Sequence, residues 1–112
     1  MIELIAIGLT LMSSSYTMPT YFSASQAKIA RQVIKQAHKL GEDPYILMAI
    51  AWQESRIQKG RTSRTGDVGI FQINWSFWGK RIWKYKSYQQ FVEDMDNIQH
   101  GTLAAVMVLR EM

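Results

Sequence analysis

The sequence predicts one mainly helical domain that is built around a central buried helix, with a long loop or small hairpin beside that helix. Two stretches place apolar residues at helical spacing behind residues that start helices, and between them and the C-terminus lies a segment rich in Gly, Thr and Ser. At 112 residues, of which 47% are hydrophobic, the chain is long enough to bury one core and too short for two.

The N-terminal segment, residues 1–20, precedes the domain predicted over residues 21–112. Its apolar run, Leu4–Met12, is too short to cross a membrane as a helix. The small polar residues Ser13–Ser15 follow the run as in an export signal, but Glu3 stands where such a signal carries positive charge. Two alternatives therefore stay open, a cleaved signal peptide and an apolar helix packed on the domain.

The first helix of the domain is expected to begin at Ser25, a helix-capping residue, and to end at Gly41. Its apolar side chains recur every three or four residues, as one buried face requires. These positions are Ile29, Ala30, Val33, Ile34, Ala37 and Leu40.

A second helix is expected over Pro44–Ser55, because Asp43 is a capping residue and proline favours the first helical position. From Ile46 to Trp52 this helix has no polar stripe, so it is predicted to be buried all round. A loop or small hairpin follows over residues 59–69, and a single last helix is expected to begin near Ser87 or Asp94 and to run to the C-terminus.

The charge is concentrated in the middle of the chain. Between residues 56 and 86 the only acid is Asp67, whereas this basic segment carries Arg56, Lys59, Arg61, Arg64, Lys80, Arg81, Lys84 and Lys86. Such a field attracts anionic partners, and it is also typical of an ordinary solvated surface. With no cysteine and only two histidines, the sequence gives no reason to expect a metal or another cofactor.

Glu54 stands at the end of the apolar helix, where a carboxylate would meet two obstacles to ionisation. The low dielectric of a buried helix and the negative end of the helix dipole both raise a carboxyl pKa. An acid that stays protonated near neutral pH can protonate the leaving oxygen of a glycosidic bond. The alternative is an ordinary exposed residue at a helix end.

Three motifs then decide between these interpretations. AWQES at 51–55, GDVGIFQIN at 66–74 and DNIQHG at 96–101 resemble, in this order, the lysozyme-like lytic transglycosylase family with its SLT domain. The resemblance covers roughly residues 26–112 and is closest to small members associated with secretion systems, conjugation, pili or phages. It implies a lysozyme-like fold, a location in the periplasm, cell envelope or virion, and cleavage of peptidoglycan between N-acetylmuramic acid and N-acetylglucosamine.

The resemblance also implies roles for individual residues. Glu54 matches the single catalytic acid and base, which closes an anhydro ring on the muramic acid, and Ser55 matches the serine that braces the site. Substrate binding is expected to involve Ser55, Gly69, Phe71, Gln72 and Asn74. Asp67 stands where animal lysozymes carry a second carboxylate, which would make the protein a muramidase; we favour Asp67 as a brace of its own glycine-rich turn.

The sequence departs from the family in lacking the later Ala-Tyr-Asn motif, whose tyrosine faces the catalytic glutamate; Tyr85 or Tyr88 is a candidate substitute. This gap keeps open a non-catalytic peptidoglycan-binding module. A nucleic-acid binder is not expected, because Glu54 would repel phosphates. The rings between residues 75 and 85 are each expected to pack in the core: Trp75, Phe77, Trp78, Trp83 and Tyr85.

Overall fold

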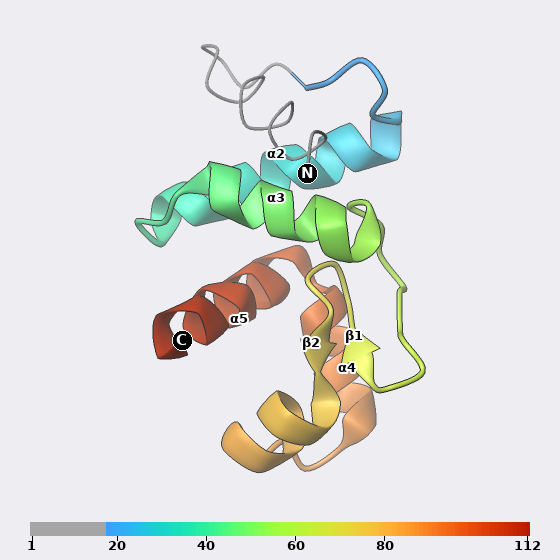
Figure 1. The fold of residues 1–112 in the computed structure, drawn as a ribbon, viewed down its shortest axis with the longest axis vertical. Helices are drawn as coiled ribbons and strands as arrows, with labels where there is room; N and C mark the ends of the chain where they lie inside the picture. Colours follow the sequence, from blue (N-terminus) through green and yellow to red (C-terminus); the bar gives the residue numbers. More distant parts are fainter. Residues whose placement is uncertain (1–17) are drawn as a thin grey trace.

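The computed structural model describes residues 18–112, and most of the N-terminal segment for which two alternatives were open lies outside the described residues. The elements are α2 (Ala24–Lys39), α3 (Pro44–Ser55), β1 (Asp67–Val68), β2 (Ile73–Asn74), η2 (Trp75–Ile82), α4 (Tyr88–Asp96) and α5 (Ile98–Glu111) (Figure 1). The mainly helical class is confirmed. None of the helices described here is long and apolar enough to cross a membrane.

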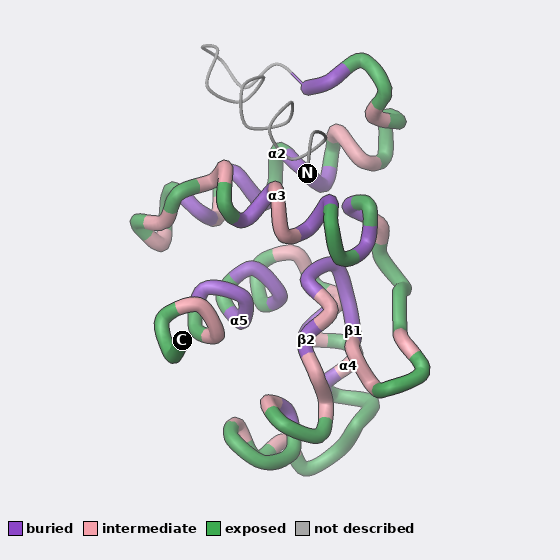
Figure 2. The backbone as a smooth tube through the Cα atoms, in the orientation of Figure 1, coloured by how far each residue is buried: buried purple, intermediate pink, exposed green. Residues whose placement is uncertain are grey.

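The helices form two groups joined through α5. Helix α2 packs on both α3 and α5, and at the other end of the molecule α4 packs on η2 and β1 (Figure 1). Figure 2 shows the buried residues on the faces that these elements turn toward one another. The core takes side chains from every element except η2, whose Trp75 and Trp78 pack against it. Its largest fully buried members are Phe91, Leu47, Met48, Ile57 and Ile70.

The N-cap of helix α2 lies two residues before the predicted one. Ser23, and not Ser25, is the N-cap: its hydroxyl accepts from the Gln26 amide, while the Gln26 side chain accepts from the Ser23 amide. The prediction of Ser25 was wrong because the reciprocal pair needs a glutamine or glutamate three residues after the serine. Ser23 has Gln26 at that position, whereas Ser25 has Lys28. The end was predicted correctly, since Gly41 adopts a left-handed φ of 69° just past the helix.

Helix α3 has the predicted bounds but is not buried all round. The Asp43 side chain accepts from the Tyr45 amide, and Pro44 occupies the first turn, as expected. The face toward the other helices is buried, whereas Ile46 is 51% exposed. The prediction of complete burial was wrong because a small domain has too few elements to surround a twelve-residue helix.

The segment predicted as a loop or small hairpin, residues 59–69, is mostly loop and carries only the first strand of a small hairpin, whose second strand lies beyond that range. Strands β1 and β2 are antiparallel, with Asp67 opposite Asn74 and Val68 opposite Ile73. The π-helix η2 follows directly and was not predicted. Gly79 allows it to pack closely, because a Cβ there would lie 2.7 Å from atoms of the Phe91 ring.

The predicted single last helix is in fact two helices. Asn97 has an extended backbone (φ −78°, ψ 130°), and its side chain accepts from the His100 amide, so it ends α4 and caps α5. Helical periodicity continues through both helices in the sequence, so the apolar pattern does not indicate the break.

Candidate active site

Glu54 lies in the last turn of α3, directly before an abrupt change of chain direction. Arg56 and Ile57 both adopt left-handed backbone conformations, with φ of 55° and 57°. This conformation is costly for a β-branched residue such as Ile57, which is nevertheless almost completely buried. The Gln26 side chain donates to the Arg56 carbonyl at 2.8 Å and so attaches this turn to α2. Helix α3 before Glu54 and the attached turn after it therefore hold the backbone of Glu54 in place.

Ser55 connects the end of α3 to the tip of the hairpin. Its side chain is buried, and its hydroxyl lies 2.7 Å from the Ile70 carbonyl and 3.2 Å from the Ala51 carbonyl. The hydroxyl gives the Ile70 carbonyl a donor, whereas the Ala51 carbonyl also accepts from the Ile57 amide. The bracing role implied for Ser55 agrees with this geometry, because the hydrogen bond joins the AWQES and GDVGIFQIN motifs beside Glu54.

The environment of Glu54 favours its protonated form. Partial burial raises the pKa of the carboxyl above its ordinary value of 4.5, and the negative charge of Asp67 raises it further. The residue as a whole remains exposed, so the desolvation is incomplete and solvent or a ligand can reach the carboxyl. This is the combination that a general acid requires.

Asp67 has the opposite environment. Its carboxylate accepts hydrogen bonds from the Asn74 side chain at 3.0 Å, from Ser63 at 3.0 Å and from Thr65 at 3.2 Å. The hydrogen bond from Asn74, followed by those from the two hydroxyls, holds the pKa of Asp67 below its ordinary value of 3.8 against the opposing effect of burial. Asp67 thus braces its own loop through hydrogen bonds from three side chains.

Gly69, which was expected to take part in substrate binding, approaches the backbone of α4 closely. With φ of 85°, a Cβ at Gly69 would lie 2.5 Å from the Met95 carbonyl oxygen. A Cβ at Gly101, in the first turns of α5, would lie 2.6 Å from the same oxygen. We refer to this arrangement as the Met95 contact. The hairpin and α5 thus approach α4 at one carbonyl, and each approach requires a glycine.

The amide side chains proposed to bind sugars are engaged within the protein. The Gln72 amide nitrogen donates to the carbonyls of Arg61 and Gly69. The side-chain nitrogen of Asn74 donates to the Thr65 carbonyl and to the Asp67 carboxylate, while the side-chain oxygen of Asn74 accepts from the Phe77 amide.

Phe71, the remaining residue of the predicted substrate-binding set, is 4% exposed and belongs to the core. For Phe71, Gln72 and Asn74 a structural role is thus visible, and substrate binding stays a prediction.

The candidate tyrosines are also engaged elsewhere. The Tyr85 hydroxyl donates to Asp94 at 2.6 Å, and burial together with this contact raises its pKa to about 12. Tyr88 packs edge-on against Trp75, with ring centroids 5.4 Å apart. No hydrogen bond between residues 18 and 112 joins either tyrosine to Glu54. Four of the five predicted core rings pack on the core; Phe77 is 45% exposed, so the prediction was wrong for it.

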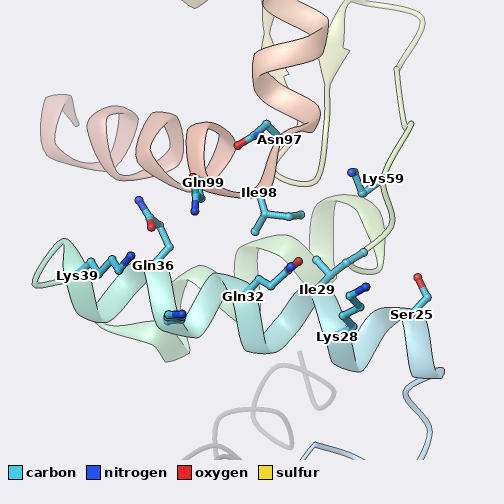
Figure 3. Close-up of a pocket in the computed structure, with 11 residues that line it drawn as sticks. Ser25, Lys28, Ile29, Gln32, Gln36, Lys39, Lys59, Asn97, Ile98 and Gln99 are labelled. Carbon is cyan, nitrogen blue, oxygen red and sulfur yellow. The ribbon is translucent and has the colours of Figure 1, made fainter.

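A hollow of about 630 Å³ lies away from Glu54. It is formed by α2 and the junction of α4 and α5, and Glu54 does not line it (Figure 3). Among residues 18–112, no three His, Cys, Asp or Glu side chains lie together as a metal ion requires.

A family model, the transglycosylase SLT domain, matches residues 31–112. The chain belongs to this family. No curated protein and no solved structure matches the chain in the other two comparisons. Membership confirms the resemblance seen in the three motifs. At the level of the family it establishes a function of the lytic transglycosylase type, the cleavage of glycosidic bonds in peptidoglycan.

Three residues that support this SLT domain site were missed by the sequence analysis. Gln26 holds the turn after Glu54, Asp96 accepts from the Gly60 amide at 2.7 Å, and Ile57 anchors the left-handed turn in the core. A capping-box pattern points to Gln26 in the sequence. No local pattern points to the other two: Asp96 binds an amide 36 residues away, and nothing in the sequence around Ile57 marks a left-handed turn.

Proposed function

We propose that this SLT domain cleaves the bond between N-acetylmuramic acid and N-acetylglucosamine as a lytic transglycosylase, with Glu54 as its single acid and base. The substrate lies in the bacterial cell wall, so we propose the periplasm or the cell envelope as its location. The proposal rests on the family and on the contrast between two carboxyl groups.

That contrast is the observation that carries the proposal. Partial burial, and then the charge of Asp67, raise the pKa of Glu54, whereas hydrogen bonds from Asn74, Ser63 and Thr65 lower the pKa of Asp67. Two carboxyls whose pKa values are moved apart identify the protonated acid and the permanently ionised group. Glu54 is therefore the proton donor of the pair. Asp67 uses both oxygens to hold its loop, which argues against a second catalytic carboxylate.

The proposed reaction uses one carboxyl group twice. Glu54 first donates its proton to the glycosidic oxygen, and the bond from that oxygen to the anomeric carbon breaks. The resulting carboxylate then accepts the proton of the sugar's own primary hydroxyl as its oxygen bonds to the anomeric carbon. The product carries a 1,6-anhydro ring, water is not consumed, and Glu54 is protonated again for the next cycle.

Glu54→Gln tests the assignment because it removes proton transfer with little change of shape. We expect the release of soluble muropeptides from purified sacculi to fall on the order of a hundredfold or more. Glu93→Gln, an exposed acid on α4 that undergoes the same change of charge, is the matched control and is expected to retain activity. A Glu54→Gln variant that cleaves at a comparable rate would refute the role of Glu54.

Mass spectrometry of the products distinguishes the two reaction types. Anhydro-muramic ends are expected from a transglycosylase. Reducing ends would identify a muramidase that uses Glu54 and Asp67 together, and binding to sacculi without any cleavage would identify a peptidoglycan-binding module.

A further inference from the structure

The hollow between α2 and the α4–α5 junction, which we call the α2 groove, has a volume of about 630 Å³. Side chains of α2 line one wall, residues 97–99 line the other, and Lys59 stands at one end (Figure 3). The residues that line it include no acid. The groove is thus a second surface of the SLT domain that the reaction at Glu54 does not use.

The charge of the groove is strongly positive. Lys28, Lys35 and Lys39 project from α2 and Lys59 from the loop after α3. Helix α2 contains no Asp or Glu, so its lysines have no acidic neighbour on their own helix. In the described part of the chain, the ion pairs involve Arg110 and His100 and none of these four lysines. Four ammonium groups around one hollow favour a ligand with several negative charges.

The remaining polar side chains of the groove specify the kind of anion. Gln36 on α2 faces Gln99 across the hollow, and Gln32 lies farther along the same wall (Figure 3). Side-chain amides both donate and accept hydrogen bonds, as peptide groups do. No aromatic residue lines the groove. Stacking rings are what binders of single-stranded nucleic acid use, and their absence from this lining favours a peptide over a nucleic acid.

The spacing of the lysines suits an extended chain. At a rise of 1.5 Å per residue, Lys28 and Lys35 are separated by about 10 Å along α2, and Lys35 and Lys39 by about 6 Å. In an extended peptide, residues two or three positions apart are separated by roughly 7 to 10 Å. Carboxylates at such positions can each meet one ammonium group.

We propose that the α2 groove binds the carboxylate-bearing stem peptides of peptidoglycan. The proposal extends the proposed function, since it assigns a second contact with the same polymer, remote from the bond that is cleaved. Binding there retains the enzyme on the wall between cleavage events and favours strands that carry peptides over bare glycan. The groove takes part in recognition only, and it contributes no group to the chemistry.

The test measures binding of a free stem peptide with unblocked carboxylates, by calorimetry or by NMR of the full chain at low salt. Lys28→Gln/Lys35→Gln/Lys39→Gln is expected to weaken binding on the order of tenfold, and binding by the wild type is expected to fall as salt is added. Glu54→Gln is expected to bind the peptide as the wild type does. Binding and catalysis are therefore tested separately, and either proposal can fail alone.

A matched pair of single variants separates the groove from general electrostatics. Lys35→Gln and Arg31→Gln remove the same charge from exposed positions one turn apart on α2, and Arg31 does not line the groove. Only Lys35→Gln is expected to weaken binding by a factor of two or more. If the triple variant fails to fold, these two single variants still test whether the groove binds the peptide.

Four results would overturn the proposal. They are no binding by the wild type at millimolar peptide, equal binding of a peptide whose carboxylates are amidated, equal losses in the two single variants, and tighter binding of an oligonucleotide of equal charge. The last result would identify the groove as a nucleic-acid site.

Discussion

Asp67→Asn is expected to destabilise the hairpin more than it slows catalysis. The carboxylate accepts three side-chain hydrogen bonds, two at one oxygen and one at the other. Asparagine keeps one oxygen, which can serve Ser63 and Thr65, but its amino group then faces the amino group of Asn74. Asn74 cannot turn round without losing its bond to the Phe77 amide, which caps η2. One hydrogen bond is therefore lost and two lose their charged acceptor.

The magnitude follows from these three bonds. A hydrogen bond to a charged group contributes about 1.5 to 3 kcal/mol and a neutral one about 1 kcal/mol. Because Asp67 is half-exposed and its charge is partly screened, we expect a net loss of about 2 kcal/mol. For a domain of this size that lowers the melting temperature by roughly 8 °C. Thermal unfolding followed by circular dichroism measures the change, and Glu93→Gln is expected to melt within about 2 °C of the wild type.

The pH dependence of this difference has a defined sign. Because the pKa of Asp67 is lowered on folding, its contribution is present above its ordinary value of 3.8 and is lost as the pH falls through the folded value below that. The two proteins should therefore differ fully at pH 6 and converge in strong acid. An unchanged melting temperature at pH 6 would refute the bracing role.

Catalysis by Asp67→Asn should survive with a shifted pH profile. Burial remains, but the charge that further raises the pKa of Glu54 is gone, so its pKa falls. The alkaline limb of the activity profile, where Glu54 loses its proton, should move to lower pH, while the maximal rate per folded molecule changes only several-fold. A folded Asp67→Asn protein as inactive as Glu54→Gln would show that both carboxyls take part, as in a muramidase.

Gly69→Ala is expected to lower the free energy of unfolding by about 3 kcal/mol or more, because the new methyl group meets the Met95 carbonyl as well as the strain of a left-handed backbone. Gly41→Ala has the same strain but no atom within 4 Å, so about 1 kcal/mol is expected; equal losses measured by chemical denaturation would contradict the clash at Gly69. Arg61→Gln/Arg64→Gln should weaken binding to sacculi mainly at low salt and leave the cleavage product unchanged; lost activity on uncharged chito-oligosaccharides would place these arginines in the site. Glu54→Gln should have a higher melting temperature than the wild type at pH 7, since burial and the charge of Asp67 disfavour ionised Glu54 in the folded protein. This difference in melting temperature should vanish as the pH falls through 4.5, and a lower melting temperature of Glu54→Gln at pH 7 would contradict the raised pKa.

The sequence was sufficient where local chemistry determines local structure. Asp43 with Pro44 fixed the start of α3, and Gly41 fixed the end of α2. It was insufficient where two local signals compete. Asn97 caps α5 through its side chain, but the apolar spacing continues through the break, so a single helix was predicted.

The candidate site shows the same division. Glu54 at the end of an apolar helix could be predicted from residue order, and the family's motifs named Ser55 as its brace. The partners could not be predicted: Ile70 for the serine lies fifteen residues on, and Gln26 lies thirty residues before the turn that it holds. Gln72 and Asn74 were proposed for their sugar-binding chemistry, which says nothing of whether a nearer carbonyl or carboxylate already engages the same amide.

The Met95 contact has a consequence for anyone who transplants this site into another scaffold. Gly69 and Gly101 belong to motifs that lie far apart in the chain, yet both are needed at one carbonyl oxygen. A graft that carries the hairpin without α4 and α5 would leave Gly69 with no surface to approach. The backbone freedom of this glycine would then only destabilise the hairpin. The two motifs are one engineering unit, and a portable version of this site needs Gln26, both glycines and the whole of α5, which packs on α2 and on α4.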